Sequence, residues 1–113
     1  ARTIEERRAA LAEEIRREVA RARNEPYAEV AGAVHDTADE ALADLVADVD
    51  NAEVTRDLAE LRALGAARER IADGTYGICT DCGADIPVER LRVQPAALRC
   101  IGCQTRYEKT HGR

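Results

Sequence analysis

The chain is poor in aromatic residues and lacks the bulkiest apolar ones. Its 113 residues include three tyrosines but no phenylalanine, tryptophan or methionine. Side chains this small do not fill a thick globular core, whereas helices that pack closely through Ala, Leu, Ile and Val need no aromatic residues. The composition therefore favours a mainly helical protein.

Long apolar runs are also missing. No apolar segment approaches the roughly 20 residues that span a bilayer, and the first residues do not show the pattern of a secretory signal. Charged residues make up 35% of the chain, which is typical of extensively solvated helices. We therefore expect a cytoplasmic protein that does not enter a membrane.

Basic charge is scarce in the middle of the chain. Residues 25–60 contain eleven acidic residues against Arg56 alone, whereas the segments before and after them each carry a small excess of basic residues. Binding to nucleic-acid phosphates needs the opposite balance. The acidic block therefore suits a basic protein surface or a metal-rich site, and a merely solvated surface is the alternative interpretation.

The first third of the chain has the apolar periodicity of an amphipathic helix. Apolar residues recur at helical spacing from Ile4 onward, and Val30 and Val34 extend the pattern past Pro26. We therefore expect Pro26 to kink this helix, and the alternative is that the helix ends near Asn24.

A second apolar stripe contains no proline and predicts one continuous helix over about 39–73, ended by Gly74. Neither stripe is buried unless the two helices pair, so we predict a long antiparallel helical hairpin, a coiled coil, over residues 1–74. Its tip lies near 33–41, within the acidic block. Because such a hairpin buries its own stripe, we expect a monomer.

All four cysteines lie in the last third of the chain, as two Cys-x-x-Cys pairs with seventeen residues between them. This is the spacing of a four-cysteine zinc site, and both sulfurs of each pair can reach one tetrahedral ion. The predicted ligands are Cys79, Cys82, Cys100 and Cys103. Four thiolates leave no open position, so Zn²⁺ would be structural. Two disulfides, a redox pair or bound iron are the alternatives.

The segment around these cysteines, residues 75–113, forms a predicted zinc-finger module with a short C-terminal helix. Its core is too small to fold without metal, since the large apolar residues expected to form it are few, namely Tyr76, Ile78, Ile86, Val88, Leu91, Val93 and Leu98. The −2 charge of zinc with four thiolates can be offset by nearby arginines, namely Arg90, Arg92, Arg99 and Arg106. The same arginines leave a zinc-ribbon nucleic-acid-binding protein as an alternative.

Three segments carry a likeness to a known family. They are residues 73–83, residues 86–91 followed by Pro95 and the second cysteine pair, and residues 36–41, which read Asp-x-x-Asp-x-Ala. Behind a charged helical hairpin, this order resembles the DksA/TraR family of bacterial RNA polymerase regulators. The likeness covers nearly the whole chain but not the N-terminal segment of the longer members, which implies a shortened member.

The resemblance implies a transcription regulator that is not an enzyme. Such proteins bind the β′ rim of RNA polymerase and pass the hairpin through the secondary channel, without reading a DNA sequence. By the motif, the residues acting near the polymerase's catalytic region would be Asp36, Asp39 and Ala41. A Gre-like transcript-cleavage factor is the enzymatic alternative, although such factors lack a four-cysteine module.

The response to ppGpp is expected to be weak or absent. Family members that respond to this alarmone hold it with basic residues, and a polyphosphate needs positive donors. The corresponding positions of this chain are Ala63, Gln94 and Gln104, none of which is cationic.

Overall fold

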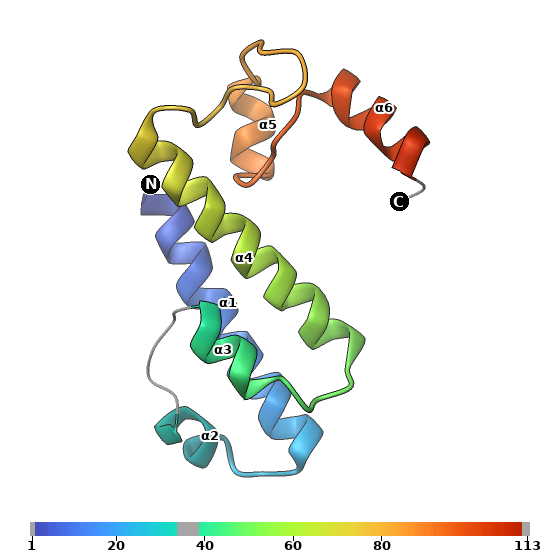
Figure 1. The fold of residues 1–113 in the computed structure, drawn as a ribbon. Coiled ribbons are helices and arrows are strands. Elements are labelled where there is room, and N and C mark those ends of the chain that lie inside the picture. The colour runs from blue at the N-terminus through green and yellow to red at the C-terminus, as the bar shows by residue number, and fades with distance from the viewer. Residues whose placement is uncertain (1, 34–38, 112–113) are drawn as a thin grey trace. The chain divides into compact units, whose positions relative to one another are not determined.

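The computed structural model describes residues 2–33 and 39–111, and the chain divides into two compact units, residues 1–66 and residues 67–113. The helices are α1 (Arg2–Arg23), α2 (Tyr27–Ala33), α3 (Asp39–Leu45), α4 (Ala52–Asp73), α5 (Val88–Val93) and α6 (Ile101–His111) (Figure 1). No strand occurs among the described residues, so the predicted mainly helical fold is confirmed.

In the first unit α1 pairs with α4, and the two helices run in opposite directions (Figure 1). Arg7 of α1 forms an ion pair with Glu60 of α4 at 2.7 Å. All four helices of the unit supply its buried core, which consists of Ala12, Ile15, Val19, Ala20, Val30, Leu42, Leu45, Leu58 and Leu61. Each fully buried Leu, Ile or Val contributes about 1.5–3 kcal/mol. Because residues of α1 and α4 share this core, the predicted pairing of the two apolar stripes is confirmed.

α1 ends before Pro26, so the predicted kink at this proline is wrong. Asn24 follows the last helical residue in the left-handed conformation, with φ of 56°. The N–H of Asn24 donates to the Arg21 carbonyl at 3.2 Å, and the N–H of Glu25 donates to the Ala20 carbonyl at 2.9 Å. This is the Schellman arrangement, which satisfies the last carbonyls of a helix. The helix is therefore closed before the chain reaches the proline.

The continuous helix predicted over 39–73 is also wrong, because the chain leaves helical geometry between α3 and α4. A guanidinium nitrogen of Arg23 donates to the Leu45 carbonyl at 2.7 Å, at the end of α3. The same nitrogen lies 3.0 Å from the Asp48 carboxylate. A cation that binds a terminal carbonyl stabilises a helix end. The side chain that ends α3 thus comes from the end of α1.

Asn51 begins α4 in the manner of a helix N-cap. Its side-chain oxygen accepts the N–H of Glu53 at 2.9 Å and the N–H of Val54 at 3.1 Å. The sequence Asp-Asn at 50–51 is a recognisable cap signal, but the apolar periodicity that continues across it hides the break.

The other end of α4 lies where the sequence predicts it. Gly74 has φ of 83°, a conformation that glycine adopts without a steric penalty. Its N–H donates to the Ile71 carbonyl, and the N–H of Thr75 donates to the Arg70 carbonyl at 2.9 Å. The predicted stop at Gly74 is therefore confirmed.

We expect Asn51→Ala to lower the free energy of unfolding by about 1 kcal/mol, because two backbone N–H groups lose their acceptor. Asp50→Ala, at the exposed neighbouring position, is the control and should change stability little. Urea denaturation followed by circular dichroism measures both. Equal stability of Asn51→Ala and the wild type would show that this cap does not hold the start of α4.

Candidate metal centre

The first cysteine pair sits on a tight turn closed by backbone hydrogen bonds. The N–H of Cys79 donates to the Ala84 carbonyl at 2.8 Å, and the N–H of Gly83 donates to the Cys79 carbonyl at 3.0 Å. Gly83 has φ of 78°, so a residue with a β-carbon would be strained there. The turn also points the N–H of Cys82 at the Cys79 sulfur, 3.5 Å away.

The second pair lies at the start of α6, where Cys103 belongs to the first turn and Cys100 precedes the helix. The Cys100 carbonyl accepts the N–H of Gln104 at 2.9 Å, which continues the helical pattern back to this cysteine. The N–H of Thr80 donates to the Leu98 carbonyl at 2.9 Å. This bond joins the segment before the second pair to the turn that carries the first pair.

The four cysteine sulfurs form one cluster. They lie within 4.8 Å of one another, and the Cys82 and Cys100 sulfurs are 4.0 Å apart. A tetrahedral zinc with Zn–S bonds of about 2.3 Å places its sulfurs about 3.8 Å apart. Disulfide sulfurs are about 2.05 Å apart, and all four cysteines are free. The donor set therefore fits a structural Zn²⁺, as predicted.

The thiols differ strongly in acidity when no cation is bound. The backbone N–H of Cys82 is the main cause that lowers the pKa of Cys79, to about 6. Burial is the main cause that raises the pKa of Cys103 to about 12, with a further contribution from the three neighbouring thiols. Metal binding must displace the Cys103 proton, so zinc affinity decreases as the pH falls.

Three of the four arginines near the cluster are held by contacts within the module. Arg106 donates to the Cys103 sulfur at 3.1 Å, which partly offsets the charge of a thiolate. Arg99 forms an ion pair with Asp81 at 2.9 Å, and its guanidinium lies 3.8 Å from the centre of the Tyr107 ring. Arg90 donates to the Arg99 carbonyl at 2.9 Å.

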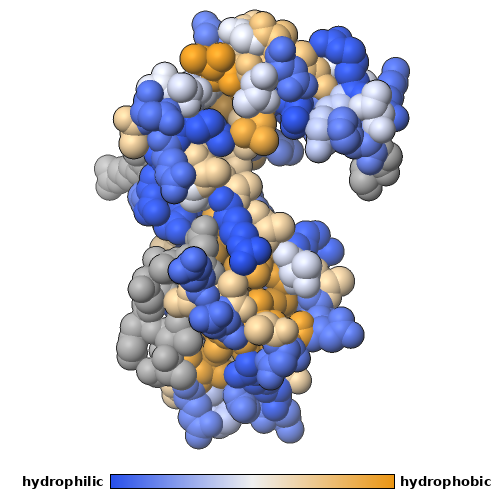
Figure 2. Space-filling view, viewed as in Figure 1, coloured by the Kyte–Doolittle hydropathy of each residue, from blue (hydrophilic) through white to orange (hydrophobic). Residues whose placement is uncertain are grey.

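The apolar core of the module is smaller than its sequence suggests. Of the seven large apolar residues expected to form it, only Ile86 is buried, together with Cys79 and Cys103. The exposed ones are Ile78, Val88, Val93 and Leu98. Figure 2 shows orange apolar groups at the surface among blue charged ones. With so little buried area, the module depends on its metal even more than expected.

The structure describes only part of the predicted hairpin tip. Asp36 lies outside the described residues, and Asp39 is the first residue of α3, with a side chain that is also outside them. Ala41 is half-buried, and Leu42 and Leu45 of the same helix are buried in the core of the first unit.

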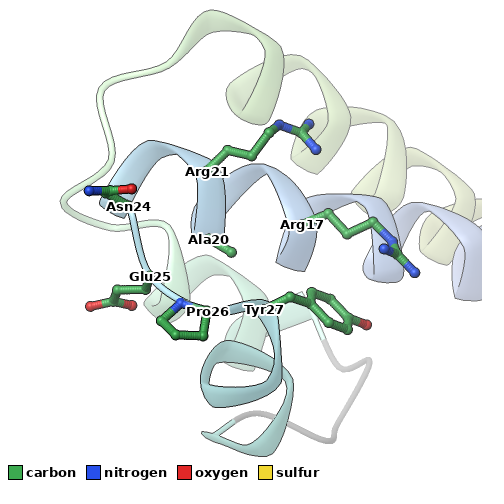
Figure 3. Close-up of a pocket in the computed structure, with 7 residues that line it drawn as sticks. All are labelled: Arg17, Ala20, Arg21, Asn24, Glu25, Pro26 and Tyr27. Carbon is green, nitrogen blue, oxygen red and sulfur yellow. The ribbon is translucent and has the colours of Figure 1, made fainter.

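A shallow groove of about 520 Å³ opens beside the end of α1 (Figure 3). Two cations line it. The Arg17 guanidinium lies 4.6 Å from the centre of the Tyr27 ring and forms an ion pair with Glu13, whereas Arg21 forms an ion pair with Glu14. Both cations therefore have partners within the chain, and the groove is not the candidate site.

The turns, the sulfur cluster and the two helices around it define a small C4-type zinc-binding module. Residues 74–109 match the family model for the prokaryotic dksA/traR C4-type zinc finger. This match supports, for the zinc-binding module, the resemblance to the DksA/TraR family that the sequence predicted.

Several curated proteins are similar to part of the chain. An uncharacterised 8.2 kDa protein of Escherichia phage P2 is 36% identical over 47 residues, which are 42% of this chain and 64% of that protein. General stress protein 16O of Bacillus subtilis is 38% identical over 56 residues, 50% of this chain and 33% of that protein. The RNA polymerase-binding transcription factor DksA of Escherichia coli K12 is 38% identical over 40 residues, 35% of this chain and 26% of that protein.

The chain thus aligns with less than two thirds of the length of each of these relatives. No solved structure matches it significantly. A search of the described residues for a helix long and apolar enough to cross a bilayer finds none.

Removing zinc is expected to unfold residues 74–111 because metal binding supplies most of the folding free energy of so small a core. We expect a chelator, or Cys79→Ser, to abolish the hydrogen-exchange protection of this segment. Thr80→Ala, at the exposed position between two ligands, is the control and should keep one zinc per chain. A module that stays protected without metal would contradict the structural role of zinc.

Proposed function

We propose that this protein is a transcription regulator that binds RNA polymerase and is not an enzyme. The observation that carries the proposal is the match of residues 74–109 to the dksA/traR zinc finger, together with the similarity to DksA, which is described as an RNA polymerase-binding transcription factor. The paired helices α1 and α4 give the chain an elongated helical element in addition to this module, and such an element suits insertion into a channel.

In this proposal, zinc has a purely structural task. Cys79, Cys82, Cys100 and Cys103 bind the ion with four thiolates, so no coordination position remains for a substrate or water. The metal keeps the turn at the first pair and the start of α6 in a fixed geometry.

The acidic block is the element that acts on the polymerase. We infer that the segment containing Asp36, Asp39 and Ala41 enters the secondary channel, where basic groups surround the nucleotide-handling centre. An acidic element is attracted to such a channel and oriented in it by charge complementarity. The excess of eleven acidic residues over one basic residue in 25–60 supports this role.

Nucleic-acid binding by the zinc module is the weaker alternative. Such binding needs arginines that are free to reach phosphates. Arg90, Arg99 and Arg106 instead contact a carbonyl, a carboxylate and a sulfur of the module itself. Only Arg92, which is exposed, remains of the arginines that suggested this alternative.

The test is binding to core RNA polymerase combined with a promoter transcription assay. We expect Asp39→Asn to bind the polymerase nearly as well as the wild type but to lose the effect on transcription, since the tip acts after docking. Glu40→Gln, which removes a neighbouring exposed charge, is the control and should keep most of the effect.

Three results would count against the proposal. Failure of the zinc-loaded wild type to bind polymerase would reject the proposed function itself. Loss of binding by Asp39→Asn would make the tip an affinity element instead of an effector. Shortening of the transcript in a stalled elongation complex would show a cleavage activity and overturn the non-enzymatic assignment.

We further propose that the regulator acts with little or no help from ppGpp. Gln104, one of the three non-cationic positions, donates its side-chain amide to the Glu108 carboxylate at 2.9 Å. That carboxylate would repel a polyphosphate. We expect ppGpp to change the transcriptional effect of this protein far less than that of DksA assayed in parallel, and an equal enhancement of both would refute the proposal.

A further inference from the structure

Glu18 is a buried acidic residue that has no role in the proposed function. It lies on α1 in the unit that α1 forms with α4, and the residue is only 3% exposed. Neither of its carboxylate oxygens has a hydrogen-bond donor. An ionised carboxylate in such a place would be strongly unfavourable, because burial removes its hydration and nothing replaces it.

The charged groups that act on Glu18 are all acidic. The charges that raise its pKa are those of Asp57 and Glu53 on α4 and of Glu14, which lies one turn away on α1. Glu14 itself forms an ion pair with Arg21 at 3.5 Å. Burial first, then the hydrogen bond with Asp57 that only a protonated carboxyl can make, and then the negative charge of Asp57 raise the pKa of Glu18 to about 8.

A proton, and not a metal ion, is the cation that this acidic group takes up. Within the described parts of the chain, the four cysteines are the only set of three or more potential ligands whose donor atoms converge. The carboxylates around Glu18 do not meet that condition. Two neighbouring carboxyl groups can, however, share one proton, because the protonated group donates to the ionised one.

We propose that Glu18 and Asp57 form a proton-dependent contact between α1 and α4, which holds the two helices together while the pair keeps a proton and weakens when the proton is lost. In the protonated state the O–H of one carboxyl donates to the other. In the ionised state two negative charges face each other, Glu18 at a buried position and Asp57 at a half-buried one, and separation of the helices hydrates Glu18.

The direction of the pH dependence follows from the two states of the chain. The pKa of Glu18 is 4.5 in the unfolded chain and about 8 in the folded chain. Between these two pH values the folded chain therefore binds more protons than the unfolded chain. Stability from this contact is therefore fully present below pH 4.5, decreases as the pH rises, and is lost above pH 8. From pH 6.5 to pH 9 the opening equilibrium constant increases up to about 30-fold.

Hydrogen exchange of the zinc-loaded full chain tests the proposal, because it reports the opening of α1 without relying on the zinc module. We expect the protection factors of α1 amides to fall by up to about 30-fold from pH 6.5 to pH 9 in the wild type. Glu18→Gln should abolish most of that decrease, since its amide is neutral and still donates to Asp57. Glu69→Gln, an exposed substitution on α4, is the control and should keep the wild-type dependence.

An NMR titration of the Glu18 side-chain carbon gives a second readout that does not depend on any variant folding. A midpoint near 8 supports the proposal, and a midpoint between 4 and 5 overturns it. Equal pH dependence of protection in the wild type and in Glu18→Gln also overturns it. None of these results depends on polymerase binding, so failure here is distinct from failure of the proposed function.

Discussion

Four zinc–thiolate bonds take the place of a hydrophobic core in the C-terminal module. Burial of Ile86, the one large aliphatic side chain buried there, is worth about 1.5–3 kcal/mol, whereas a structural zinc site contributes about 10–16 kcal/mol at neutral pH. Metal binding therefore stabilises the module far more than apolar burial does. Around the sulfur cluster, Arg90 of α5 donates to the Arg99 carbonyl and the Arg99 guanidinium lies over the Tyr107 ring of α6.

The helical unit is instead stabilised mainly by the burial of apolar side chains. Its apolar stripe is buried between α1 and α4, but α1 also buries Arg8, Arg16 and Glu18. Arg8 and Arg16 lie near Glu5 and Glu13 at 3.6 Å, so their charges have partners, whereas Glu18 faces other acids. A strong apolar contact therefore stabilises the helix pair, and we infer that Glu18 makes this stability depend on pH.

The zinc-finger module and the helical unit contribute differently to the proposed function. The family likeness rests on the zinc finger, since the family model covers residues 74–109. The helical unit, in turn, carries the whole acidic block, residues 25–60. In the proposed function the zinc-finger module carries the family likeness, and the acidic segment of the helical unit acts on the polymerase.

Much of the architecture could be predicted from the sequence because it depends on local or strongly periodic signals. The cysteine spacing predicted the metal cluster, the apolar stripes predicted the helix pairing, and Gly74 predicted the end of α4. These features follow from the reach of a short loop, from the 3.6-residue period and from the conformational freedom of glycine.

Other features were decided only by the tertiary structure. The end of α3 depends on Arg23, a side chain more than twenty residues away, and periodicity does not report such a contact. The exposure of Val88 and Val93 and the burial of Glu18 likewise depend on what packs against each residue. The sequence by itself determined that the chain is mainly helical and that its four cysteines form one cluster, because these follow from local spacing. Where α3 stops and which acidic group is buried were decided by contacts between distant residues.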